Sequence, residues 1–295
     1  MPYGYEKYRL AKGISDKTTV IEVSLIKNFL AYVNGVYKKT VAPHEIRPKD
    51  VHNFLDAERE KNISDSTINR KLVYLRNWFN FMWEEGKVPV DFMPKLNYQK
   101  KLDLKPKSSI INLNYMELLE KRADVLTSEI PLAAKLFYIF DLRGIRRRDS
   151  IRIKLEDIID YGNYLTVTIN TSFEQSVTLE LSNDEEIAVL LQAIEKATFR
   201  DVEYIFSKKE KDKFVPITVS SENYCNDALA KVLGYPLKSE HVRFSYVHYL
   251  YVHENKKIEE IQQCLGTNIG TTTSILKEAL VRVKDIDYTN QRRTS

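Results

Sequence analysis

One block of alternating and β-branched residues, positions 150–181, interrupts a chain whose other apolar residues recur at helical spacing. Its segments SIRIKLEDIID, YLTVTIN and SVTLEL are typical of β-strands, and turn signals at 161–163 and 171–175 separate them. The block therefore predicts one small antiparallel sheet. Because helical patterns stand on both sides of it, we expect a mainly α protein with this sheet inserted in its second half.

Three amphipathic segments near the start of the chain predict a helical N-terminal domain. The first follows Ser15, a candidate N-cap, the second opens at Pro48, and the third ends at Gly86. Helical spacing predicts the side chains that face inward. They are Val20, Val23, Ile26, Phe29, Leu30 and Val33 in the first segment, Val51, Phe54 and Leu55 in the second, and Ile68, Leu72, Leu75, Phe79 and Met82 in the third.

A chain of 295 residues exceeds the usual size of one small core, which favours two domains. Between positions 97 and 109 the sequence NYQKKLDLKPKSS is poor in apolar residues and has the composition of a linker. We therefore expect a helical domain at 1–96, a basic linker at 97–109 and a second domain at 110–295. The linker contains lysines that can follow a phosphate backbone, namely Lys100, Lys101, Lys105 and Lys107.

The composition limits the partners and the compartment. A net charge of +4 and a pI of about 8.7 permit a polyanionic partner without demanding one. Cys225 and Cys264 stand far apart without metal-binding spacing, which favours buried thiols in a reducing compartment. No cofactor or metal motif is visible, and no stretch has the length and apolarity of a signal peptide or a membrane span. We expect a cytoplasmic protein without a cofactor.

Two sequence motifs in the second half of the chain resemble motifs of a known protein family. The sequence LRGIRRRDSIRIKLEDI matches the frame in which tyrosine recombinases (phage integrases) hold their first catalytic arginine, and it selects Arg146. In EHVRFSYVHYLYVHENKKIEEIQQCLGT, Arg243 matches the second arginine of the family's His-x-x-Arg box. The segment STINRKLVYLRNWFNF resembles the helical, SAM-like core-binding domain of the same family. The resemblance extends from about residue 15 to 283, and it implies DNA binding by residues 1–96 and a catalytic-type domain at 110–295.

The other family positions hold different residues here. In this family a tyrosine attacks the scissile phosphate, arginines stabilise the developing charge, and a lysine and histidines move protons. The corresponding positions are Phe173 for the lysine, Glu240 and Thr267 for the histidine-type residues, and Leu276 for the nucleophile. These replacements predict a catalytically inactive, recombinase-like protein that is not an enzyme. The alternative is an active, divergent recombinase with a relocated nucleophile such as Tyr288.

The two retained arginines can hold a phosphate, because a guanidinium is always charged and can donate two parallel hydrogen bonds. For Arg146 the alternative role is a structural ion pair, and we expect Arg147 and Arg148 to be surface residues. A solvated helix face is the alternative for the basic cluster in the third segment. The residues predicted to bind DNA are Arg146, Arg243, Arg70, Lys71, Arg76, Lys100, Lys101, Lys105 and Lys107.

These features favour a sequence-specific double-stranded DNA-binding protein. The sequence resembles the lysogeny-maintaining repressors of SPβ-like phages, which implies transcription regulation at an operator in a prophage or mobile element. A third alternative is an accessory protein that associates with itself or with a partner integrase through the C-terminal tail DYTNQRRTS.

Overall fold

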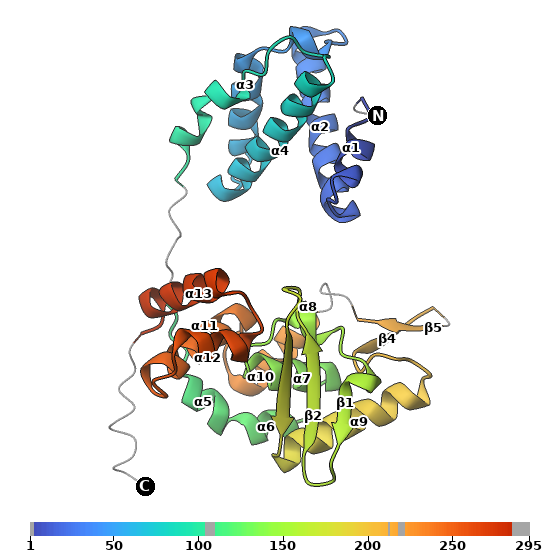
Figure 1. Ribbon diagram of the computed structural model, residues 1–295, viewed down its shortest axis with the longest axis vertical. Coiled ribbons are helices and arrows are strands. Elements are labelled where there is room, and N and C mark those ends of the chain that lie inside the picture. The colour runs from blue at the N-terminus through green and yellow to red at the C-terminus, as the bar shows by residue number, and fades with distance from the viewer. Residues whose placement is uncertain (1–2, 104–109, 212, 218–221, 285–295) are drawn as a thin grey trace. The chain divides into compact units, whose positions relative to one another are not determined.

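The computed structural model describes residues 3–103, 110–211, 213–217 and 222–284, and it divides into two compact units, Met1–Lys107 and Ser108–Ser295 (Figure 1). The first residues of the proposed linker belong to the N-terminal unit, because Asn97–Lys101 form the 3-10 helix η3. Tyr98 of η3 is fully buried and donates a hydrogen bond of 2.7 Å to Asp56. Lys105 and Lys107 lie outside the described residues.

The N-terminal unit is helical, as the apolar spacing predicts. Its elements are α1 (Tyr5–Ala11), α2 (Asp16–Tyr37), η1 (Pro43–Glu45), α3 (Pro48–Arg59), α4 (Asp65–Glu84), η2 (Met93–Lys95) and η3. Ser15 caps α2, because its side chain accepts a hydrogen bond from the backbone N–H of Thr18. The predicted inward residues of α3 and α4 are all buried. In α2 the prediction for Val20 is wrong, since 61% of this side chain is exposed.

Helix α1 is absent from the sequence prediction, in which the first helical segment follows Ser15. Tyr5 is fully buried and donates a hydrogen bond of 2.8 Å to Glu22 of α2. Arg9 of α1 forms an ion pair of 2.7 Å with the same carboxylate. A helix of seven residues has too few apolar positions to show a period, so its tertiary contacts decide its structure.

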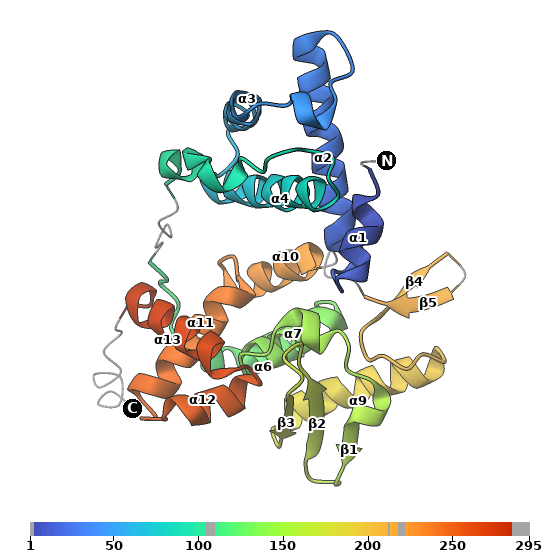
Figure 2. The same cartoon turned by 45° about the horizontal axis from the view of Figure 1, so that its top comes forward.

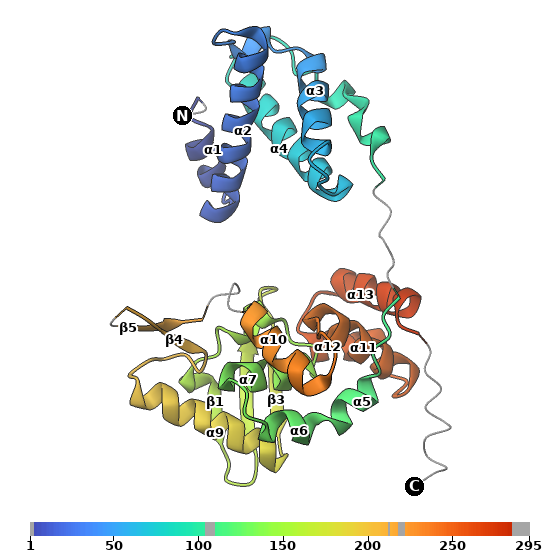
Figure 3. The same ribbon diagram turned by 180° about the vertical axis from the view of Figure 1, so that it is seen from behind.

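The C-terminal unit combines helices with two small antiparallel sheets. Its helices are α5 (Tyr115–Glu120), α6 (Arg122–Thr127), α7 (Leu132–Asp141), α8 (Arg147–Ser150), η4 (Leu155–Asp157), α9 (Asp184–Phe199), α10 (Glu222–Leu233), α11 (Ser239–Val252), α12 (Ile258–Leu265) and α13 (Ile269–Arg282). Its strands are β1 (Ile158–Asp160), β2 (Leu165–Asn170), β3 (Ser176–Leu181), β4 (Ser207–Glu210) and β5 (Lys213–Pro216). Helix α10 packs on α6 and α7, while α11, α12 and α13 pack on one another (Figure 3).

The three-stranded sheet has the order β1-β2-β3, and Val167 of the central strand pairs with Ile158 and Leu179. The mainly α fold with a small antiparallel sheet is therefore confirmed. Two details differ: most of residues 150–157 belong to α8, η4 and the turn between them, and a second hairpin, β4–β5, projects beyond the end of α9 (Figure 2). The sequence of that hairpin is SKKEKDKFVP. Because it is rich in lysine, it shows no alternation of apolar and polar residues from which strands could be predicted.

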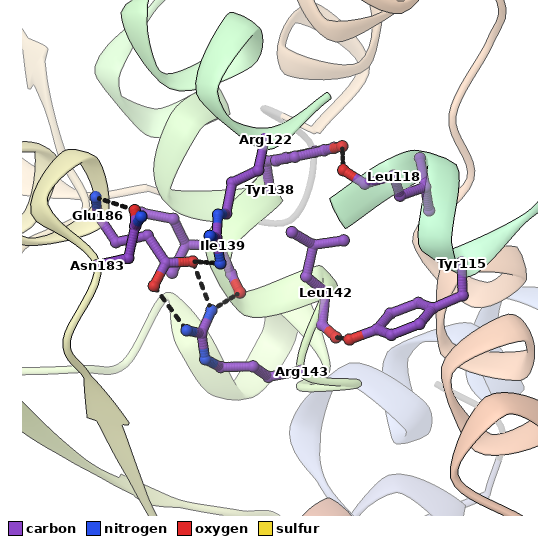
Figure 4. A network of polar contacts seen from close by, with 9 residues as sticks. All are labelled: Tyr115, Leu118, Arg122, Tyr138, Ile139, Leu142, Arg143, Asn183 and Glu186. Carbon is purple, nitrogen blue, oxygen red and sulfur yellow. Dashed lines mark hydrogen bonds and ion pairs between the residues drawn. The ribbon is translucent and has the colours of Figure 1, made fainter. Parts of the chain in front are cut away.

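A buried polar network fixes the end of α7 (Figure 4). Glu186 of α9 is fully buried and accepts hydrogen bonds of 3.0 and 2.6 Å from Arg143. Arg122 approaches the same carboxylate at 3.6 Å, and Tyr115 donates to the carbonyl oxygen of Leu142 at 2.7 Å. These contacts hold the residues just before Gly144 and therefore set the direction in which the chain enters α8.

Gly266 is the C-cap residue of α12, and the space around it leaves no room for a side chain. Its φ is +54°, and a Cβ there would lie 2.5 Å from Cγ2 of Val177 and 2.6 Å from Cγ2 of Thr171. The absence of a side chain thus lets the turn after α12 lie directly on β3 and the end of β2. Thr171 joins the two elements by donating a hydrogen bond of 2.6 Å to the Gly266 carbonyl oxygen.

We expect Gly266→Ala to lower the free energy of unfolding by about 2–3 kcal/mol, because it combines left-handed backbone strain with overpacking. Urea denaturation measures this loss. Gly162→Ala is the matched control, since Gly162 has a φ of +89° and a Cβ added there would meet nothing within 4 Å. Equal losses for the two variants would mean that the close packing against Val177 and Thr171 contributes nothing.

Candidate nucleic-acid interface

Arg146 stands at the start of α8, in the N-cap position. The chain reaches it through a tight turn in which Gly144 has a φ of +68° and packs so closely that a Cβ would lie 2.7 Å from Leu265 and Tyr246. The turn therefore rests on α11 and α12. In the described residues Arg146 makes no ion pair, and its guanidinium lies 4.6 Å from the ring centroid of Phe173.

Arg243 lies in the second turn of α11 and faces the same pocket as Arg146. The pocket has a volume of about 420 Å³ and is lined by Arg146, Arg147, Arg148, Ser239, Glu240, Arg243, Phe244 and Ile275. Nε and Nη2 of Arg243 are buried and make no hydrogen bond within the described part of the chain. Unpaired buried donors on a cation are costly, and an anion in the pocket would satisfy them.

The electrostatics of the pocket favour an anion. Burial lowers the pKa of Arg243 to about 9, and the positive charge of Arg146 acts in the same direction. Burial also lowers the pKa of Arg146, with a contribution from Arg148. Both shifts mean that the charged guanidinium groups are less stable here than in water. A phosphate between them would offset this cost, since the arginine fork matches two phosphate oxygens.

The prediction that Arg147 lies on the surface is wrong. Its side chain is buried and pairs with the buried Asp141 at 2.7 Å, and it also donates a hydrogen bond of 2.7 Å to Asn226. Ser239, the first residue of α11, donates a hydrogen bond of 2.7 Å to the same Asp141 carboxylate. Arg148 is exposed, as predicted. The buried ion pair therefore connects α7, α8 and α11 beneath the pocket.

The four replaced family positions lie in different surroundings. Phe173 is half-buried beneath Arg146, and Glu240 lines the pocket with an exposed carboxylate. Thr267 is buried and hydrogen-bonded to Thr272 at 2.7 Å. Leu276 is 8% exposed and belongs to the core of the C-terminal unit, while its neighbour Ile275 lines the pocket. Tyr288 and the tail lie outside the described residues.

The basic residues predicted for the N-terminal unit differ in their availability. Lys71 is paired with Glu58, and Lys101 lies 3.5 Å from Asp56, so both have intramolecular partners. Arg70 and Lys100 are exposed and make no ion pair within the described ranges. Arg76 is half-buried, and its Nε makes no hydrogen bond with the described residues. Among the predicted basic residues of this unit that the structure describes, Arg70, Arg76 and Lys100 therefore have no ion-pair partner.

Sequence reasoning missed the supporting residues around the two arginines. Asp141, Asn226 and Ser239 come from three separate elements, and no local pattern brings them together. The sequence shows only that an acidic residue, Asp141, stands six positions before Arg147, and this spacing alone does not reveal that the two side chains are buried together. Of the cysteines, Cys225 is buried as predicted and Cys264 is partly exposed.

Within residues 3–103, 110–211, 213–217 and 222–284, no helix is long and apolar enough to cross a membrane. The same residues contain no group of three or more histidine, cysteine or acidic side chains arranged to hold a metal ion.

Comparison with known sequences identifies related proteins. Residues 4–86 match the model of the phage integrase N-terminal SAM-like domain. Tyrosine recombinase XerD of Listeria monocytogenes is 21% identical, over 93% of this chain and 92% of that protein. The SPbeta prophage-derived "probable integrase/recombinase YopP" of Bacillus subtilis is 22% identical, over 59% of this chain and 54% of that protein.

Solved structures share the fold. A lambda integrase fragment, crystallised as a dimer bound to a COC' core site, has a TM-score of 0.67 at 16% identity and covers 96% of both chains. The XerH site-specific recombinase bound to its difH substrate has a TM-score of 0.58 at 17% identity, over 80% of this chain and 69% of that chain.

These comparisons correct one expectation and establish another. The expectation that the protein is not an enzyme is contradicted, because the relatives that match over nearly its whole length are named tyrosine recombinases. The family resemblance is borne out by the N-terminal domain, by those relatives and by the fold. Residues 4–86 thus match the phage integrase SAM-like domain, and the chain as a whole is similar in sequence to tyrosine recombinases and shares their fold.

Proposed function

We propose that this protein binds a specific double-stranded DNA site and that Arg146 and Arg243 hold one backbone phosphate of that site. The observation that carries the proposal is that Arg243 lines the pocket while its buried Nε and Nη2 have no hydrogen-bond partner among the described residues. Arg146 lies in the same pocket and makes no ion pair in the described residues. A phosphodiester supplies two charged oxygens, which are the acceptors that two such donors require.

The N-terminal unit contributes further phosphate contacts in this proposal. Arg70, Arg76 and Lys100 have no ion pair with the described residues, so their charges are available to a polyanion. Each phosphate that such a residue neutralises steepens the dependence of binding on salt concentration. The match of residues 4–86 to the phage integrase SAM-like domain supports a DNA contact by this unit.

The biological role that we propose is transcriptional repression at an operator in phage or mobile-element DNA. The similarity to an SPbeta prophage-derived protein supports a phage setting. A protein bound over an operator excludes other proteins from it, and repression needs no chemistry beyond binding. Self-association or a partner bound through the C-terminal tail would extend the footprint on DNA.

Genome-wide recovery of bound DNA tests binding, specificity and role together. The expected result is a small number of enriched sites upstream of phage or mobile-element genes, each of which the purified protein shifts at moderate salt. Recovery of DNA without a common sequence, or the absence of any shift with the recovered duplexes, would contradict the proposal.

A second candidate function is DNA strand transfer at the bound site, which the similarity to XerD recombinases favours. The nucleophile must then come from a position other than Leu276, and Tyr288 is the one tyrosine that follows Gly266 in the sequence. A duplex that is nicked next to the scissile phosphate traps a covalent protein–DNA adduct. An adduct that disappears in Tyr288→Phe supports this candidate, and the lack of any adduct on sites that the protein binds removes it.

A further inference from the structure

The turn between β2 and β3 is joined to the arginine-bearing segment at several points. The backbone N–H of Ser172 donates a hydrogen bond of 3.3 Å to Asp149, and Arg148 donates one of 2.6 Å to the Ser172 hydroxyl. One residue further on, the Phe173 ring lies beneath the Arg146 guanidinium, 4.6 Å from its central carbon. The turn therefore has a fixed position relative to Arg146.

The contact between Arg146 and Phe173 differs from the other arginine–ring contacts of this protein. Among the described residues, five arginines lie over aromatic rings, namely Arg9, Arg146, Arg147, Arg200 and Arg282. Four of these arginines also have a polar partner. The pairs are Arg9 with Glu22, Arg147 with Asp141, Arg200 with Ser207, and Arg282 with Glu278. Arg146 has no hydrogen bond or ion pair with another residue in the described part of the chain, so the ring contact stands alone there. The ring is thus the contact that orients this side chain.

An aromatic ring suits this position for a physical reason. Its face carries a partial negative charge that attracts a cation, yet it accepts none of the in-plane hydrogen bonds of the guanidinium. A carboxylate at the same place would neutralise Arg146 and occupy its donors. A ring holds the guanidinium in place and leaves both its N–H groups and its charge free for a ligand.

We propose that Phe173 is a positioning residue that holds the Arg146 guanidinium in the pocket, ready to bind a DNA phosphate. The inference rests on the proposed DNA-binding function and adds to it the residue that orients one of the two phosphate-binding arginines. Phe173 stands where the family resemblance places a lysine. In this chain the β2–β3 turn therefore does not contact the phosphate through a lysine, and its Phe173 instead orients Arg146, which makes the contact.

The test compares the affinities of Phe173 variants for a duplex that the wild-type protein binds. Phe173→Leu keeps an apolar side chain of similar size and removes the ring, so affinity is expected to fall by about 3- to 30-fold. Phe173→Tyr keeps the ring and is expected to bind within about twofold of wild type. Phe214→Leu is the matched control, because Phe214 lies beneath Arg200, whose Nη1 is also hydrogen-bonded to Ser207.

A double-mutant cycle separates positioning from a general structural role. If Phe173 acts through Arg146, then Phe173→Leu has no further effect on affinity once Arg146→Ala is present. An additive loss in the double variant, or a Phe173→Leu protein that binds as tightly as wild type, would overturn the inference. Failure of the wild-type protein to bind any duplex is a different result, since it refutes the proposed function itself.

Discussion

Arg243→Met is expected to weaken specific DNA binding by roughly tenfold to a hundredfold while leaving the free protein equally or more resistant to unfolding. The loss of affinity follows from removing a charge-assisted contact with a phosphate, for which about 1.5–3 kcal/mol is the usual size, equivalent to roughly tenfold to a hundredfold. The gain in stability follows because Arg243 is a cation with buried, unpartnered nitrogens, whose pKa is lowered to about 9 mainly by burial. Methionine removes that cost and fills a similar volume. Fluorescence anisotropy and thermal unfolding measure the two quantities.

Arg148→Met is the matched control for this prediction. Arg148 lines the same pocket, but half of its side chain is exposed and it is hydrogen-bonded to Ser172. Both variants lose one positive charge, so a long-range electrostatic effect would weaken binding equally in the two. Equal losses, or a marked fall in the melting temperature of Arg243→Met, would contradict a phosphate-binding role for Arg243.

The sequence was sufficient for the secondary structure wherever apolar residues have a clear period. The inward faces of α3 and α4 and the alternation of β2 were all predicted correctly. Helix α1 and the β4–β5 hairpin were missed, because a seven-residue helix and a lysine-rich hairpin show no such period. For α1, contacts with distant residues, such as Tyr5 with Glu22, determine the local conformation.

The roles of the adjacent residues Arg146 and Arg147 could be predicted only in part from the sequence. Among adjacent arginines, the sequence frame selected Arg146 as the one that binds a phosphate, which stays a prediction; in the structure Arg146 lines the pocket that Arg243 also lines. The assignment of Arg147 to the surface failed, since a four-residue helix has no period from which to read its inner side. Its direction depends on Asp141, a carboxylate that lies six positions earlier and is buried in α7. Burial of that acid could not be read from the sequence DLRGIRRRD alone.

Leu276 stands at the position of the family's nucleophile, and it is buried in the core of the C-terminal unit. The step from that position to a protein without enzymatic activity went beyond what one replaced residue can support, because a nucleophile can be supplied from elsewhere. Activity must be measured on DNA, as in the adduct assay.

Asp141→Asn is expected to lower the free energy of unfolding by about 3–5 kcal/mol, which is the usual cost of leaving one partner of a buried ion pair without the other. Arg147 is 4% exposed and would keep its charge in the core of the C-terminal unit. Burial raises the pKa of the Asp141 carboxyl, and Arg147 opposes that rise by favouring the ionised form. Urea denaturation followed by circular dichroism measures the loss.

The control for Asp141→Asn removes both charges together. In Asp141→Leu with Arg147→Met, no uncompensated charge remains, and stability should return to within about 1–2 kcal/mol of wild type. The DNA affinity of this double variant is then informative, because Ser239 has lost the carboxylate that fixes the start of α11. We expect weakened binding in a folded protein, since Arg243 lies one turn further along the same helix. A double variant that recovers both stability and full affinity would show that the ion pair stabilises the domain without positioning Arg243.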